Sequence, residues 1–227
     1  KVINFTETSA GGGYIREGDS MGDVYITKVL KRDATGAIAV GADGSLSSMD
    51  LPNGQRLKIG NTNPDFTLGW RNNISWKGLN LSFLINARVG GIVTSATQAV
   101  LDQFGVSKAT ADARDRGYVE VAGGQRVDPQ KYYEVVANQQ LMGYYYYSAT
   151  NVRLQNVSLS YTLPKTLLGQ GWPGVTVGLI ANNLWMIYNK APFDPEVAAS
   201  TGTYGQGSDY FSAPSLRNIG FSLKLNF

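Results

Sequence analysis

The feature that most constrains the fold of this chain is a set of long runs in which apolar and polar residues alternate. One run covers 66–76, and after Lys77 and Gly78 the alternation resumes over 79–89. A period of two is typical of a strand with one apolar face, and the two-residue interruption predicts a tight hairpin. Each run is about the 9–11 residues that a tilted strand needs to cross a bilayer, whereas globular strands average ~5–6.

Three further runs extend this pattern, at 151–163, at 175–188 and from about Leu216 to Phe227. The first of them changes phase near Gln155, which predicts a β-bulge, and Pro164 ends it. A weaker run at 23–30 predicts a sixth strand. Asn72 and Asn183 interrupt the apolar faces. The sequence therefore predicts an all-β fold.

The connections between these runs are of two kinds. Lys77 and Gly78 alone join one pair, and roughly eleven residues follow Leu163, whereas long segments occupy about 31–64, 91–150 and 189–215. Segments of that length are uncommon in compact soluble domains but usual outside an outer-membrane barrel. We therefore interpret the runs as strands of a large antiparallel transmembrane β-barrel with long extracellular loops and short periplasmic turns.

The last strand ends on an aromatic residue, Phe227. An apolar edge of this kind is an aggregation hazard in a soluble protein, but in a closed barrel the strand is paired and lipid covers its apolar face. In this layout we expect aromatic girdles, one containing Trp76, Tyr161 and Phe227 and the other Phe66 and Trp185. A strand of a soluble sandwich with protected edges is the alternative, because alternation is a weak signal in each segment.

Composition excludes several functions. Among 227 residues there is no Cys and no His, which removes thiolate metal sites, the Ser-His-Asp triad and most general-base designs. The net charge of +3 is thinly spread, so nucleic acid is not an expected partner, and no metal or cofactor is predicted. The apolar stretches are too short for a membrane helix. A start at Lys1 suggests a piece of a longer protein.

Four stretches together resemble the C-terminal region of the SusC/RagA family of TonB-dependent outer-membrane transporters. They are GNTNPDFTLGW (60–70), SATNVRLQNVSLSYTLP (148–164), NNLWMIYNKAPFDPE (182–196) and PSLRNIGFSLKLNF (214–227), and REGDSMGDVYI (16–26) is similar to a family strand entry. No single motif is decisive, but their order is specific.

The resemblance implies a barrel of about 22 strands closed by a plug, of which residues 1–227 would be the C-terminal part of a single barrel domain. It implies import of glycans or peptides, energy from TonB and a SusD-like lipoprotein as lid. It also implies the outer membrane of a Bacteroidetes-like Gram-negative bacterium. Phe227 would be the signal for the barrel-assembly machinery. The plug and the TonB-contacting segment are not in this sequence, so this portion alone should not transport.

Ligand contacts are expected from aromatic and acidic side chains of the long loops, because aromatic rings stack on sugars and carboxylates hold hydroxyls. The candidates are Tyr132, Tyr133, Tyr144, Tyr145, Tyr204, Asp209, Tyr210 and Phe211. These rings equally suit packing of the loops or holding the lid. Arg71, Arg88 and Lys224 lie on the presumed inner face and should line the lumen or contact the plug.

Three remaining motifs are predicted to be structural. Asp194 and Glu196 are too close to form a catalytic acid pair and should brace a loop base. The segment 41–50 should form a turn, and 95–104 a short helix with Ala99 or Val100 and Phe104 on its packing side.

The preferred function is nutrient uptake through an outer-membrane barrel. A soluble β-rich carbohydrate-binding module or adhesin, and a passive porin, remain as alternatives. An enzyme comes last, because no nucleophile, base and stabilising group converge.

Overall fold

The structure is a computed structural model that describes residues 8–10, 13–137, 139–169, 171, 173–197 and 207–227. The chain divides into two compact units. A sheet unit comprises 64–90, 148–197 and 213–227, and a loop unit comprises 1–63, 91–147 and 198–212. The assignment of residues 1–227 to one barrel domain stays a prediction.

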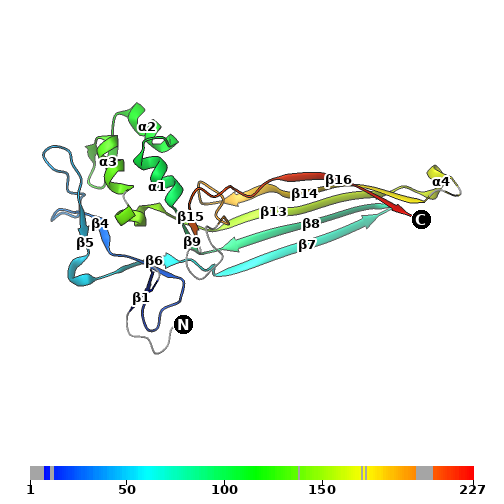
Figure 1. Ribbon diagram of the computed structural model, residues 1–227, viewed down its shortest axis with the longest axis horizontal. Helices are drawn as coiled ribbons and strands as arrows, with labels where there is room; N and C mark the ends of the chain where they lie inside the picture. The colour runs from blue at the N-terminus through cyan, green and yellow to red at the C-terminus, as the bar shows by residue number, and fades with distance from the viewer. Residues whose placement is uncertain (1–7, 11–12, 138, 170, 172, 198–206) are drawn as a thin grey trace. The chain divides into compact units, whose positions relative to one another are not determined.

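The sheet unit is built on one antiparallel sheet of five strands in the order β16-β14-β13-β8-β7 (Figure 1). Its members are β7 (Phe66–Trp76), β8 (Leu79–Val89), β13 (Asn151–Thr162), β14 (Gly174–Asn189) and β16 (Asn218–Asn226). All five long runs of the sequence are therefore strands of the same sheet, and the predicted all-β antiparallel fold is confirmed.

The hairpin of β7 and β8 has the predicted tight turn. Trp76 pairs with Leu79 and Phe66 with Val89, so the two strands are in register along their whole length. Lys77 and Gly78 have φ angles of 46° and 85°. Two consecutive positive φ angles are the mark of a type I′ turn, whose twist matches that of the strands.

Two irregularities interrupt the ladder where the apolar pattern breaks. The register of β13 on β8 shifts between Leu154 and Asn156, which leaves Gln155 as the predicted bulge. Opposite it on β14, Asn183 adopts a φ of 50°, a left-handed conformation that Asn tolerates better than most residues.

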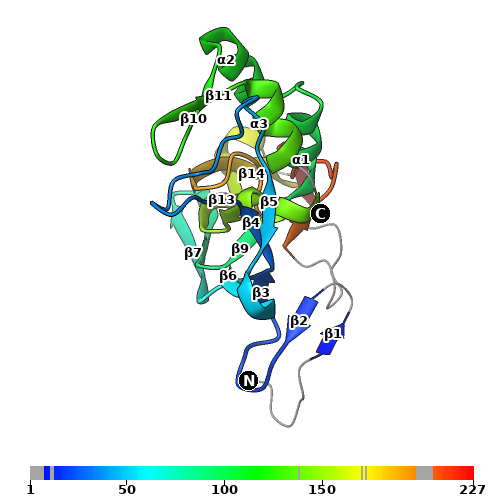
Figure 2. The same cartoon turned by 90° about the vertical axis from the view of Figure 1, so that its left-hand side faces the viewer.

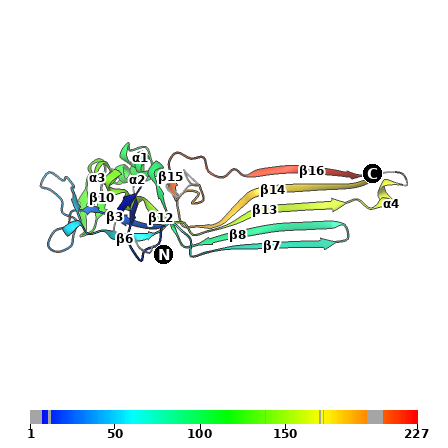
Figure 3. The same cartoon turned by 60° about the horizontal axis from the view of Figure 1, so that its bottom comes forward.

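The two ends of the sheet differ as the connection lengths predict. The β7–β8 turn, the short helix α4 (Lys165–Leu168) and the C-terminus lie at one end (Figure 3). Long connections leave the opposite end, after β8 and β14. The outer strands β16 and β7 each pair on one side only within the described residues, so closure onto further strands stays a prediction.

The loop unit contains short strands that form small sheets of their own. The strands are β1 (Thr8–Ala10), β2 (Gly13–Ile15), β3 (Asp23–Ile26), β4 (Lys28–Leu30), β5 (Ser48–Asp50), β6 (Leu57–Asn61), β9 (Ile92–Ser95), β10 (Val119–Val121), β11 (Gln125–Val127), β12 (Tyr146–Ser148) and β15 (Ser208–Asp209). The expectation of a single sixth strand at 23–30 was wrong, because this run divides into β3, paired with β6, and β4, paired with β5. Leu30 is buried in the loop core, which ties β4 to this unit.

Three α-helices lie together in the loop unit (Figure 2). They are α1 (Ala96–Gln103), α2 (Lys108–Arg116) and α3 (Pro129–Val136), accompanied by the 3-10 helices η1 (Pro52–Gly54) and η2 (Gln139–Tyr145). Each α-helix begins at a polar N-cap whose side chain accepts a backbone hydrogen bond, namely Ser95, Ser107 and Asp128. The predicted helix at 95–104 is α1. Within the segment 41–50, residues 41–44 form the expected turn, in which the Gly44 amide donates to the carbonyl of Gly41, whereas Ser48–Asp50 is the strand β5.

The loop unit has a hydrophobic core of the ordinary kind. Its buried members are Leu30, Ile38, Leu46, Ala99, Val121, Val127, Val136, Ala137, Leu141 and Tyr145. Among the described residues, no helix is both long and apolar enough to cross a membrane.

Candidate functional site

One face of the five-stranded sheet is a continuous apolar surface. The register aligns Phe221 of β16, Leu179 of β14 and Leu159 of β13 in one row, and Leu81 and Ile74 continue it. These side chains are not covered: Trp70 is 53%, Leu179 55% and Phe221 69% exposed. A large exposed apolar patch of this kind marks a surface that contacts a membrane or another protein.

The predicted girdle residues lie on or beside this face. Trp76 and Tyr161 flank Leu79 in one row near the turn end, and Phe227 follows the end of β16. Phe66 begins β7 at the opposite end, but Trp185 is not in its row: the pairing of Trp185 with Leu154, and of Ile85 with Trp70, places it nearer Trp70. Their role as girdles stays a prediction.

The opposite face of the sheet is polar and rich in amides and hydroxyls. Asn156 Nδ2 donates to Asn182 Oδ1 at 2.5 Å, and Ser75 Oγ donates to Asn80 Oδ1 at 2.7 Å. Arg71 (opposite Leu84), Arg88 (opposite Asn151) and Lys224 (opposite Thr176) stand in register on this face. Their contact with a lumen or plug stays a prediction.

A buried ion pair closes the base of the connection after β14. Arg153 Nη2 lies 2.6 Å from Asp194 Oδ1 and 3.8 Å from Glu196 Oε2, and Arg153 Nη1 donates to Ser215 Oγ at 3.3 Å. Burial alone would raise the pKa of Asp194, but hydrogen bonds from Ser215, from the Glu196 amide and from Arg153 outweigh it and hold that pKa below its usual value. The pair Asp194 and Glu196 thus braces the loop base, in agreement with the sequence.

The predicted ligand residues of the loop unit fall into different environments. Tyr145 and Asp209 are buried: the Tyr145 hydroxyl donates to Asp102 Oδ2 at 3.0 Å, and Asp209 Oδ2 accepts from Ser95 Oγ at 2.9 Å. These bonds give both residues a structural role, so the ligand prediction stays with the more accessible members. Tyr204 lies outside the described residues.

Tyr210 and Phe211 form an exposed aromatic pair. Their rings lie 5.1 Å apart in an edge-to-face arrangement of 85°. Phe211 has a φ of 49°, and its amide donates to Thr97 Oγ1 of α1 at 2.6 Å. A non-glycine residue in the left-handed region costs about 1–3 kcal/mol, so the fold holds these rings outward against a local strain.

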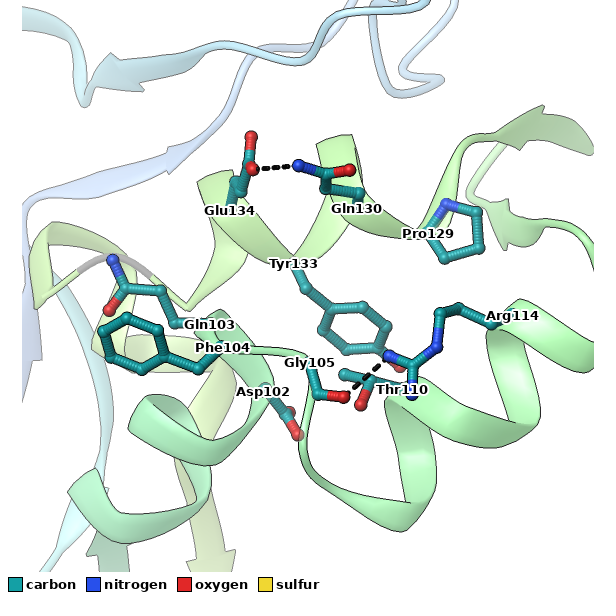
Figure 4. Close-up of a pocket in the computed structure, with 10 residues that line it drawn as sticks. All are labelled: Asp102, Gln103, Phe104, Gly105, Thr110, Arg114, Pro129, Gln130, Tyr133 and Glu134. Atoms are coloured by element: carbon teal, nitrogen blue, oxygen red, sulfur yellow. Dashed lines mark hydrogen bonds between the residues drawn. The ribbon is translucent and has the colours of Figure 1, made fainter.

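Tyr133 contributes to a pocket of about 250 Å³ between α1, α2 and α3 (Figure 4). Its ring points from α3 toward the α1–α2 connection, and Tyr132 packs against the loop core instead. Burial raises the pKa of Tyr133, with the charge of Asp102 as the second cause. The lining consists of Asp102, Gln103, Phe104, Gly105, Thr110, Arg114, Pro129, Gln130, Tyr133 and Glu134. Tyr144, the first of the four consecutive tyrosines at 144–147, is exposed.

The pocket also corrects one expectation. Phe104 was placed on the packing side of its helix, but it is 73% exposed, and Ala99 and Asp102 are the buried residues of α1. Phe104 is the C-cap residue, where the chain leaves the helical direction, so helical spacing no longer governs its side chain. Sequence reasoning also missed Asp102 and Arg114, since only the packing of three helices brings them to one pocket.

Comparison with known proteins supports one assignment. No family model matches the chain. The chain is 27% identical over 191 residues to TonB-dependent receptor P3 of Formosa agariphila, a match that covers 82% of this chain and 18% of the receptor. The chain therefore spans less than a fifth of the length of this relative.

Solved structures show the same fold. The RagAB peptide importer matches in its open-open state with a TM-score of 0.64 and 17% identity, over 99% of this chain and 24% of that chain. Its closed-closed state matches with a TM-score of 0.58 and 18% identity, over 95% and 26%. The chain is thus similar in sequence to a part of a TonB-dependent receptor and in fold to a part of the RagAB peptide importer, and the resemblance noted in its sequence is confirmed.

Proposed function

We propose that this chain is the C-terminal barrel portion of a TonB-dependent transporter that imports oligopeptides or oligosaccharides across the outer membrane of a Gram-negative bacterium. A SusD-like lipoprotein would cover its mouth, and TonB would act through the part of the transporter that precedes this chain. The observation that carries the proposal is the exposed apolar face of the sheet. No catalytic role is proposed.

The dimensions of this face suit a bilayer. A strand of 11 residues such as β7 extends about 36 Å at ~3.3 Å per residue. A tilt of ~45° reduces its reach across the bilayer to about 25 Å, the height of the apolar band of an outer-membrane barrel. Lipid is therefore a sufficient cover for Leu179, Trp70 and Phe221, and the polar face would meet the lumen or the plug.

Site-directed spin labelling in the full-length protein tests this proposal. Because this chain contains no Cys, single cysteines can be introduced along β14, β13 and β16 without first removing any from it. Spin labels at Leu179→Cys and Phe221→Cys should relax faster on collision with oxygen dissolved in the lipid. The matched controls Ser158→Cys and Ser222→Cys lie on the polar face and should be reached by a water-soluble nickel chelate.

In outer-membrane vesicles, accessibility to oxygen and accessibility to the nickel chelate should alternate along each strand with a period of two residues. If the nickel chelate reached Leu179→Cys as readily as Ser158→Cys, lipid would not cover the apolar face and the transporter proposal would fail. Uptake of cargo that stops when the proton-motive force is collapsed would separate the energised transporter from a passive porin.

A further inference from the structure

We infer that the pocket between α1, α2 and α3 binds a primary ammonium group on an aliphatic stem, as on the lysine side chain of an oligopeptide, and that Asp102 receives it. The inference rests on the proposed function, because it names a chemical class of cargo for that transporter. It concerns only residues of the loop unit.

Asp102 is a buried carboxylate without a cationic partner. Asp102 is only 5% exposed. Oδ1 accepts from Gln98 Nε2 at 2.7 Å and Oδ2 from the Tyr145 hydroxyl at 3.0 Å, and both donors are neutral. Among the described residues, no ion pair within 4.0 Å involves Asp102. Buried charges are normally paired, because their removal from water is costly.

The position of Asp102 in its helix adds to the negative potential. The residue lies in the last turn of α1 (Ala96–Gln103), a turn without a basic residue. The carbonyl groups at a helix C-terminus carry partial negative charge and favour a cation there. Burial raises the pKa of Tyr145, with the charge of Asp102 as the second cause, so the surroundings of Asp102 favour a positive group and disfavour a further negative one.

The walls of the pocket suit an aliphatic stem. Phe104 and Tyr133 contribute aromatic rings, and Pro129 adds an apolar surface (Figure 4). Aromatic faces near an ammonium group add a cation–π attraction. The volume of about 250 Å³ corresponds to roughly eight water molecules, which is room for one side chain and not for a folded segment.

The other charged groups of the lining leave this preference in place. Arg114 Nη1 donates to the carbonyl oxygen of Gly105 at 2.7 Å, and among the described residues Arg114 forms no ion pair within 4.0 Å, so it is not the partner of Asp102. Glu134 at the rim accepts from Gln130 Nε2 at 2.7 Å and adds a second carboxylate. A neutral sugar could stack on Phe104, but it would leave Asp102 without a counter-charge. The lining therefore favours an ammonium group over a glycan.

Two small probes test the inference on the full-length transporter in detergent. Nα-acetyl-lysine methylamide carries the ammonium group, and Nα-acetyl-norleucine methylamide has nearly the same stem without it. In saturation-transfer NMR titrations, the wild-type protein should bind the lysine probe about tenfold more tightly than the norleucine probe. Asp102→Asn should reduce this ratio to about threefold or less, because the counter-charge is lost.

The matched control is Asp112→Asn, which removes one carboxylate of α2 outside the pocket, where Asp112 pairs with Lys108, and should leave the ratio unchanged. If Asp102→Asn perturbs the fold, Phe104→Ala provides a second test, since this ring is mostly exposed and its removal should weaken lysine binding about threefold.

Equal binding of the two probes to the wild-type protein would overturn the inference. So would a ratio that survives Asp102→Asn in a folded protein, or a neutral oligosaccharide that displaces the lysine probe at lower concentration. These titrations are made in detergent and need no transport. Their failure would therefore not affect the spin-label test of the sheet, and failure of the spin-label test would not affect these titrations.

Discussion

In the loop unit, Leu30, Val127 and Leu141 are almost completely buried, whereas in the sheet unit Trp70, Leu179 and Phe221 are more than half exposed. The buried apolar residues that the structure describes in the sheet unit are small ones, Ala149, Ala181 and Ala191. The two units thus use apolar side chains in opposite ways, although both come from one chain of ordinary apolar content.

The difference shows what each unit requires from its surroundings. The loop unit buries its own apolar surface against helices and short strands, as a water-soluble domain does. The sheet unit satisfies its backbone through the strand ladder but leaves one whole face uncovered, which is a stable arrangement only next to another apolar phase. Substitutions of the same kind should therefore have different effects in the two units.

The largest effect should come from Arg153→Ala in the sheet unit, where the large buried side chain is a polar one and the buried apolar residues are alanines. Removal of the guanidinium group leaves the carboxylate of Asp194, whose side chain is 10% exposed, without its partner. We expect the base of the loop to lose about 3–5 kcal/mol of protection in native-state hydrogen exchange of the full-length protein. Arg217→Ala, an exposed arginine beside the same ion pair, is the control and should change little.

Acid should weaken the same brace. Because the pKa of Asp194 is lower in the folded protein than its usual value of about 3.8, its contribution to stability is complete above that value and is lost as the pH falls through the lowered pKa. Hydrogen exchange around 190–197 should therefore accelerate in that acidic range in the wild-type protein and much less in Arg153→Ala. A pH profile that is identical in both proteins would contradict the assignment of the brace.

Truncation of one leucine in each unit should separate a protein core from a lipid-facing surface. Leu141→Ala removes a buried side chain of the loop core and should cost about 2–5 kcal/mol, because a cavity remains. Leu179→Ala should cost clearly less, since lipid can fill the space and no cavity forms. Hydrogen exchange of the two units in vesicles measures both changes. Equal losses would show that Leu179 is packed like a core residue.

Introduction of a charge at an exposed apolar residue should have the larger effect in the sheet unit, the reverse of the order expected for leucine truncation. Leu179→Arg places a guanidinium group on the apolar face and should destabilise the sheet by about 2–4 kcal/mol, with less protein assembled in the outer membrane. Val106→Arg, at an exposed apolar residue of the loop unit, should stay within about 0.5 kcal/mol of the wild type. Normal assembly of Leu179→Arg would indicate that this face of the sheet is in water, and it would contradict the contrast drawn between the two units.

The sheet was predictable from sequence because its information is local. A period of two, the pair Lys77 and Gly78 and the phase slip at Gln155 are visible without any tertiary contact, and each corresponds to a strand, a turn or a bulge. The run at 23–30 failed because alternation over a few residues does not specify a partner, and β3 and β4 pair with different strands.

The loop unit was less predictable because its sites are assembled from distant segments. The tyrosines were chosen by residue type alone, which cannot distinguish the buried Tyr145 from the exposed Tyr144. Asp102 and Arg114 join Tyr133 only through the packing of α1, α2 and α3, and no spacing in the sequence indicates it. Phe104 was misplaced because the end of α1 was assumed to continue in helical geometry.

The smallest effect should come from the helix cap Ser107→Ala, and it tests whether the two units are separate in energy as well as in composition. Ser107 Oγ accepts from the Thr110 amide at 3.1 Å and begins α2. Loss of this capping hydrogen bond should cost about 1 kcal/mol of stability. Ser107→Thr keeps the hydroxyl group and should retain most of that stability. Because the bond stabilises only local structure, amides of α2 should exchange faster while those of β8 in the sheet unit keep their wild-type rates. Faster exchange of β8 by the same factor would mean that the chain unfolds as one cooperative body, in which case the sheet would depend on the loop core and not only on the phase that covers its apolar face.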